Sequence, residues 1–155
     1  MRTVHQWLSE YGESHTHATN KLIHWICVPL IFFSITGLLY SISLPWNLQA
    51  DLPLNVAMVV LAGTTLYYFA LSPKLGIGML VFGLVCLGLC YLIEKFGPLP
   101  LWQCCLAIFI LAWIGQFYGH KVEGKKPSFF KDLQFLLIGP MWLMSFLYRK
   151  WGISY

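Results

Sequence analysis

Long apolar runs separated by short polar segments dominate this chain of 155 residues. A helix that crosses a bilayer needs about 20 predominantly apolar residues, and four of the runs approach that length. We expect membrane spans at about residues 22–42, 54–71, 75–93 and 101–118. A shorter fifth run, residues 133–148, contains Gly139-Pro140, which favours a half-span or a kinked helix.

Apolar runs of this length can satisfy their backbone polar groups internally only as helices. The composition agrees, because 58% of the residues are hydrophobic and only 10% are charged. Soluble domains carry about 25% charged residues. We therefore predict an all-α fold, a polytopic transmembrane helix bundle with four full spans and a short fifth segment. We expect one integral membrane domain over residues 1–155, with a polar segment at 1–20, the lipid bilayer as partner and no nucleic-acid partner.

The lysines and arginines predict the orientation of the bundle, because short cytoplasmic loops of membrane proteins are enriched in positive charge. With five segments, the N-terminus shares a side with the second–third and fourth–fifth loops. The positive residues on that side are Arg2, Lys21, Lys74, Lys121, Lys125, Lys126 and Lys131. Those on the opposite side are Lys95, Arg149 and Lys150, and if the fifth segment turns back, Arg149 and Lys150 join the first side as well. We expect the first side to be cytoplasmic, at the inner membrane of a bacterium or the endoplasmic reticulum of a eukaryote.

The histidines gather at the predicted cytoplasmic end of the helices. His5, His15, His17 and His24 lie before or just inside the first span, and His120 follows the fourth. The two groups are far apart in sequence but fall at a similar membrane depth. Imidazole binds iron, zinc and copper alike, so the set favours a metal site. A polar network that joins the helices is the alternative, and His5 is expected to be a solvated surface residue.

Helical spacing indicates which of the N-terminal polar residues share a face. Asn20 and His24 are four residues apart and His17 is seven residues before His24, so all three share one face of a continuous helix. His15 is nine residues before His24, on the opposite side of such a helix. His15 therefore joins the site only if the chain bends between the two, and helix geometry favours His17.

A second polar stripe is predicted at the end of the fourth span. Gln116, His120 and Glu123 follow one another at helical spacings of four and three residues. If the helix continues through Gly119, they form one stripe that faces the bundle. The basic stretch from Lys121 to Lys126 is most simply an anchor for anionic lipid headgroups, or a guide for an anionic lipid substrate.

Two sequence motifs surround the histidines. The first is Tyr11-x-x-x-His15-x-x-x-x-Asn20-x-x-x-His24, followed by Val28-Pro29-Leu30. The second, residues 116–127, reads QFYGHKVEGKKP, which fits the pattern Q-F-x-G-H-x-x-E-x-x-x-P. These two motifs resemble those of the fungal 2-hydroxy fatty acid dioxygenase family. The later Asp132-Leu133 and Gly139-Pro140 fit the same family, so the resemblance covers nearly the whole chain.

The resemblance implies an Fe(2+)-dependent dioxygenase of α-oxidation, which uses O2 to shorten a long-chain 2-hydroxy fatty acid by one carbon. It implies that His15, His24 and His120 hold the iron, with His17 as a further candidate. Motif position thus favours His15, whereas helix geometry favours His17. Glu123 would be either a ligand or an acceptor that orients an imidazole.

The resemblance also implies roles for residues around the metal. Asn20 and Gln116 would orient ligands or substrate by hydrogen bonds. Lys125 or Lys126 would pair with the substrate carboxylate, and Tyr11 would contact the substrate. The carboxylate would lie at the interface near the histidines, while the lipid tail lies in the bilayer.

Two other functions are compatible with the residues. One is a different metal-dependent lipid oxidase or hydroxylase, although such families generally carry more histidines in HxxxH and HxxHH boxes than this chain does. The other is a non-catalytic membrane protein in which the histidines form a structural network. Stoichiometric iron that is lost on replacing His24 or His120 would separate the enzymes from the structural alternative.

Overall fold

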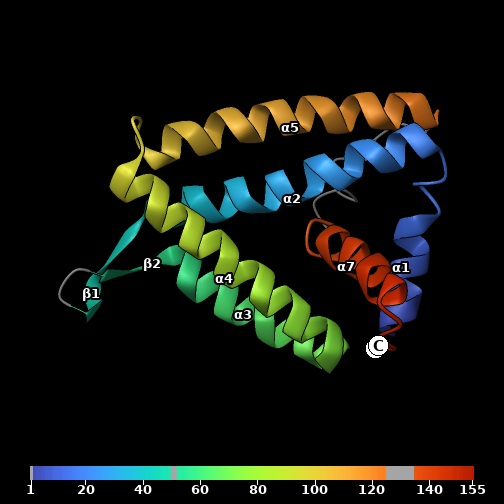
Figure 1. Ribbon diagram of the computed structural model, residues 1–155, viewed down its shortest axis with the longest axis horizontal. Helices are drawn as coiled ribbons and strands as arrows, with labels where there is room; N and C mark the ends of the chain where they lie inside the picture. The colour runs from blue at the N-terminus through green and yellow to red at the C-terminus, as the bar shows by residue number, and fades with distance from the viewer. Residues whose placement is uncertain (1, 50–51, 125–134) are drawn as a thin grey trace.

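A computed structural model describes residues 2–49, 52–124 and 135–155 of the chain. Within these ranges the fold is an all-α bundle with one small β-hairpin (Figure 1). Its helices are α1 (Val4–Gly12), α2 (Ala18–Tyr40), α3 (Val56–Leu71), α4 (Pro73–Phe96), α5 (Leu101–Glu123) and α7 (Ile138–Lys150). The hairpin is made of β1 (Ser43–Gln49) and β2 (Leu52–Asn55).

The long helices form two pairs, α2 with α5 and α3 with α4, which converge near the hairpin and diverge toward the opposite end (Figure 1). α1 and α7 lie side by side at the end away from the hairpin, called the wide end below, and pack against each other there. The core at this end is built on α7, where Met141, Trp142 and Leu143 are buried. The wide end is also the end at which α2 begins and α5 terminates.

Three helices, α2, α4 and α5, are long and apolar enough to cross a membrane. Large apolar side chains such as Leu22, Leu84 and Leu111 are more than half exposed on their outer faces. On a polytopic membrane protein these are the surfaces that contact lipid. The predicted all-α polytopic bundle is therefore confirmed, although the described residues hold three helices of full spanning length rather than four.

The second predicted span is shorter than its apolar run suggested. α3 has 16 residues and begins at Val56, because Asn55 caps it by accepting a hydrogen bond from the amide of Met58 at 3.1 Å. The residues before Asn55 pair with β1 instead. Since a helix rises about 1.5 Å per residue, α3 is about 24 Å long, less than the hydrocarbon core of roughly 30 Å.

The hairpin joins α2 to α3, between the first two predicted spans. Leu44, Trp46 and Leu48 alternate with polar or proline positions, which is the two-residue period of a strand. β1 pairs antiparallel with β2, and the register is irregular on both sides of Asn47. The side chain of Trp46 remains 64% exposed, as an interfacial tryptophan would be.

Of the fifth apolar run, predicted as a half-span or a kinked helix, the described part forms one short buried helix, α7. Gly139-Pro140 falls in the first turn of α7, where the missing amide of a proline costs no helical hydrogen bond. α7 has 13 residues, so it is about 20 Å long and too short to cross the bilayer. It fills the wide end of the bundle beside α1, α2 and α4.

α5 approaches α2 closely through two glycines, one helical turn apart on α5. A methyl group on Gly115 would lie 2.6 Å from the Sγ of Cys27, and one on Gly119 would collide with the Oδ1 of Asn20. Small residues at this spacing let two membrane helices come into backbone contact. This contact brings the end of α5 against the start of α2, which sets the position of His120.

Candidate metal centre

Three histidines from three different elements converge at the wide end. His15 lies in the turn between α1 and α2, His24 in the second turn of α2, and His120 in the last turn of α5. One nitrogen from each ring lies within 4.8 Å of the others, as a shared metal ion would require. The ring centroids of His15 and His24 are 4.2 Å apart, and that of His120 is 5.6 Å from His15 and 5.2 Å from His24.

The hydrogen bonds of two of these rings fix which nitrogen can bind a metal. The Nδ1–H of His15 donates to the carbonyl of Tyr11 at 2.6 Å, and that of His24 to the carbonyl of Asn20 at 2.9 Å. Because a carbonyl can only accept, Nδ1 carries the proton in both rings and Nε2 keeps its lone pair. Metal-binding histidines commonly use their second nitrogen in this way.

A break between α1 and α2 decides which N-terminal histidine reaches the cluster. α1 ends at Gly12, and the amide of His15 donates to the carbonyl of Gly12 at 3.0 Å, so the chain turns here. His17 is the N-cap of α2 and is exposed, with its Nδ1 accepting from the amide of Thr19 at 3.2 Å. The structure thus brings His15 to His24 and leaves His17 outside, while His5 lies away from the cluster, stacked on Tyr155.

The carboxylate of Glu123 holds this turn against the end of α5. It accepts hydrogen bonds from the amides of Thr16 and His17, each at 2.9 Å, and from the hydroxyl of Thr16. The side-chain amide of Asn20 donates to the same carboxylate at 3.0 Å and to the carbonyl of Ser14 at 3.3 Å. Both residues therefore tie the segment around His15 to the helices that carry the other two histidines.

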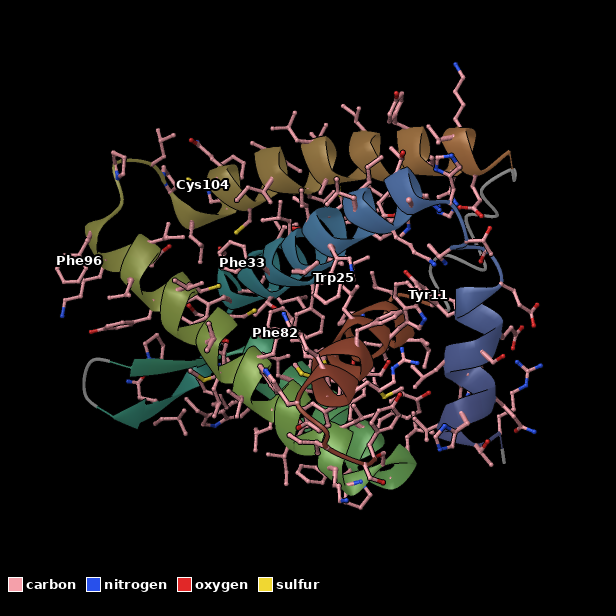
Figure 2. The ribbon with its side chains drawn as sticks, turned by 45° about the vertical axis from the view of Figure 1, so that its right-hand side comes forward. Tyr11, Trp25, Phe33, Phe82, Phe96 and Cys104 are labelled. Atoms are coloured by element: carbon pink, nitrogen blue, oxygen red, sulfur yellow. The ribbon has the colours of Figure 1, made fainter. Side chains whose placement is uncertain are left out.

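Aromatic rings cover the cluster on the side of α1 and α7. Tyr11 stacks on His15 with a centroid distance of 4.2 Å and an interplanar angle of 10°. The ring of Trp142 lies 5.5 Å from His15 and 5.2 Å from Tyr11, and Phe135 packs edge-on against Tyr11. Figure 2 shows Tyr11 pointing from α1 toward α7. Trp142 and Phe135 were not among the predicted site residues, and no spacing to the histidines signals them.

A cavity of about 40 Å³ adjoins the three histidines and is also lined by Gln116, Trp113 and Leu136. Holding one water requires roughly 10–15 Å³, so the cavity has room for an ion and for further ligand atoms. The Oε1 of Gln116 is buried beside the His24 ring, and no donor among the described residues meets it with good hydrogen-bond geometry. A buried acceptor of this kind requires a partner, and a hydroxyl or water bound beside the histidines would supply one.

The donor set fits a first-row transition ion. His15 is 4% exposed, His24 1% and His120 7%, so bulk water is largely excluded from the rings. Three imidazole nitrogens suit iron, zinc or copper, and the cavity leaves coordination positions for other ligands. Lys125 and Lys126, predicted to meet a substrate carboxylate, lie outside the described residues.

Comparisons with known proteins agree with the motifs. Residues 1–151 match the sequence profile of the family described as 2-hydroxy-palmitic acid dioxygenase Mpo1-like. The 2-hydroxy-palmitic acid dioxygenase MPO1 of Saccharomyces cerevisiae is 31% identical over 145 residues, which cover 92% of this chain and 78% of the yeast protein. No solved structure matches the chain. The predicted resemblance is therefore confirmed, and the chain belongs to the Mpo1-like family.

Proposed function

We propose that this protein is an iron(II)-dependent dioxygenase that removes one carbon from long-chain 2-hydroxy fatty acids. The observation that carries the proposal is the buried cluster of His15, His24 and His120 beside a cavity at one end of an apolar bundle. Membership of the Mpo1-like family supports the substrate class and the use of O2.

The residues of the cluster divide into those that hold iron and those that hold the ligands in place. His15 and His24 offer Nε2, and His120 completes a three-nitrogen face. Bound iron(II) would supply redox chemistry with O2 at a position that the 2-hydroxyl and carboxylate of the substrate also reach. The carbonyls of Tyr11 and Asn20 fix the rotation of two rings, and Glu123 fixes the turn that carries His15.

The residues of the cavity wall would bind the substrate. Gln116 lies beside His24, and its buried Oε1 would accept a hydrogen bond from the 2-hydroxyl of the substrate. The side-chain amide of Asn20 donates its hydrogens to Glu123 and to the carbonyl of Ser14, so its role is to position the turn that carries His15. Tyr11 lines the cavity and, with Trp142, keeps water from the reacting atoms.

The overall reaction needs no further reductant. Cleavage of the bond between C1 and C2 converts C2 into the carboxyl group of the shortened acid. The substrate loses four electrons and one O2 accepts four, so the equation balances when C1 leaves as CO2 and one water forms. The residues named above therefore have to bind and orient the substrate rather than deliver electrons.

The decisive experiment incubates the purified protein with iron(II), O2 and 2-hydroxyhexadecanoic acid and measures pentadecanoic acid. We expect the shorter acid to form, and to be lost together with bound iron in His24→Ala and His120→Ala. His5→Ala is the matched control, because His5 lies outside the cluster and should keep both. Iron-loaded protein that forms no shorter acid would refute the proposal, and a folded protein that binds no iron would favour a structural histidine network.

A further inference from the structure

A second cavity lies between α2 and α3, away from the histidines, and its walls are almost entirely apolar. α2 contributes Phe32, Ile35 and Leu39, and α3 contributes Ala57, Val60 and Leu61. The cavity measures about 50 Å³, with room for a few methylene groups before any side chain moves. None of the three clustered histidines lines it.

The two cavities follow one another along α2. Val28 and Ile31 line the cavity at the histidines, and Phe32 and Ile35 line the second one on the next turns of the same helix. Leu136 lines both cavities, so the two adjoin at this side chain. A ligand that enters the first cavity and extends along α2 therefore meets the second.

The threonines of the second cavity add no free polar group. The hydroxyl of Thr36 donates to the carbonyl of Phe32 at 2.8 Å, and that of Thr64 donates to the carbonyl of Leu61 at 3.1 Å. Each hydroxyl proton is thus used within its own helix. The lining suits a hydrocarbon and would leave the polar groups of any other ligand without partners.

We propose that the second cavity holds the acyl chain of the substrate. It is called the groove below and is defined by Phe32, Ile35, Leu39, Ala57, Val60 and Thr64. The inference rests on the proposed function, since it assumes that the carboxylate and hydroxyl are held at the histidines. Along α2, His24 and Leu39 are 15 residues apart in sequence, or about 22 Å. One leaflet of the hydrocarbon core is roughly 15 Å thick, so the path from the histidines to the far end of the groove is long enough for one extended long acyl chain.

The two ends of the groove have different roles. Leu136 stands at the end near the histidines, and the next residue, Leu137, accepts a hydrogen bond from the buried hydroxyl of Tyr68 at 2.8 Å. Ala57 lies at the far end and is fully buried, so its small side chain sets how far a chain can reach. Val60 is 41% exposed, which leaves the side of the groove open toward lipid.

The first test places a bulky residue at two depths of the groove. Thr64→Phe and Ala57→Phe should both lower the ratio of kcat/KM for a long 2-hydroxy acid to that for a short one, by about tenfold or more. Thr64 is about 10 Å closer to the histidines along α3 than Ala57. Thr64→Phe should therefore lose activity at a shorter acyl-chain length than Ala57→Phe does. Ala62→Phe is the control, because Ala62 is exposed on the same helix and does not line the groove.

The order of the two cut-offs separates the proposal from simple destabilisation. Loss of packing would lower activity on all chain lengths together and would not depend on depth along α3. Equal chain-length ratios in the wild type and in Thr64→Phe would overturn the groove. If Ala57→Phe fails to fold, Val60→Phe at the open rim replaces it as the deeper variant.

The second test does not require turnover. A 2-hydroxy acid with a photoreactive diazirine at its terminal carbon should label the α3 segment 57–64 of the iron-loaded protein, and excess unlabelled acid should prevent it. Labelling spread over the lipid-facing sides of α4 and α5, without competition, would overturn the groove. If the wild type shortens no 2-hydroxy acid, the proposed function fails, and this labelling still decides where the chain binds.

Discussion

The carboxylate of Glu123 accepts a hydrogen bond from the backbone amide of Thr16 at 2.9 Å, across a sequence separation of 107 residues. Thr16 directly follows His15, and Glu123 lies three residues after His120. The bond therefore joins the two chain segments that bring these histidines together. Because the amide of His17 donates to the same carboxylate, the turn is held at two successive residues.

Removing this carboxylate should weaken metal binding without removing a ligand. In Glu123→Ala the turn at Thr16 loses its acceptor, and His15 is no longer held against His24 and His120. Replacing a residue that orients a metal ligand typically costs 10–100-fold in affinity, and we expect a loss of about this size. Iron titration against a competing chelator measures it.

Glu94→Ala is the matched control, because Glu94 is exposed near the opposite end of α4 and touches no histidine. Glu123→Gln keeps one acceptor oxygen and should fall between the wild type and the alanine variant. An iron affinity equal to that of the wild type in Glu123→Ala would contradict the positioning role.

The choice between His15 and His17 shows which part of the site could be predicted from the sequence and which could not. Helix geometry favoured His17 because it assumed a continuous helix from that residue to His24. The helix instead begins at Ala18, with His17 as its cap, and the turn after Gly12 carries His15 inward. The turn depends on a bond to Glu123 far along the chain, so local spacing could not predict it.

Other differences have the same origin in contacts that are distant in sequence. The apolar runs predicted the long helices well, because each run satisfies its own backbone. The start of α3 depends on the pairing of β2 with β1, and the close approach of α5 to α2 depends on Gly115 and Gly119. Neither is visible in hydrophobicity alone, although the glycine spacing is a recognisable packing signal.

A pair of asparagine variants separates the two neighbouring histidines. His15→Asn should lose most of its bound iron, because one of three converging nitrogens disappears. His17→Asn should keep its iron, since asparagine is a good N-cap and replaces the bond to the amide of Thr19. Iron content of the purified proteins measures the difference. The reverse result would place His17 in the site and His15 outside it.

Gly119 should tolerate no side chain. In Gly119→Ala the new methyl group would collide with Asn20, whose amide also binds Glu123, so α5 must move away from α2. Overpacking of a tight contact typically costs about 1–3 kcal/mol, and we expect a lower thermal midpoint together with weaker iron binding. Gly63→Ala is the control, because apart from its own helix backbone no described atom lies within 4 Å of a methyl group there. Equal midpoints in the two variants would contradict the close contact.

The hydroxyl of Tyr68 should stabilise the segment before α7 by its hydrogen bond to Leu137. It is buried and donates to the carbonyl of Leu137, so Tyr68→Phe leaves that carbonyl without this partner. The net loss for one such bond is about 0.5–1.5 kcal/mol, measurable as a lower midpoint of thermal unfolding in detergent. Tyr67→Phe, on an adjacent and partly exposed ring, should change the midpoint less. An unchanged midpoint in Tyr68→Phe would show that the bond contributes nothing to holding this segment.

The orientation of the bundle is testable at exposed lysines near three helix ends. Lys74 lies at the turn between α3 and α4, Lys121 at the end of α5, and Lys95 at the opposite end of α4. In a variant without native cysteines, Lys74→Cys and Lys121→Cys should react with an impermeant thiol reagent only after the cytoplasmic side is opened. Lys95→Cys should react from the outside of intact cells or from the lumenal side of vesicles. The expected orientation rests on the enrichment of positive charge on the cytoplasmic side. The opposite labelling pattern would contradict it and would show that the histidine cluster lies on the other side of the membrane.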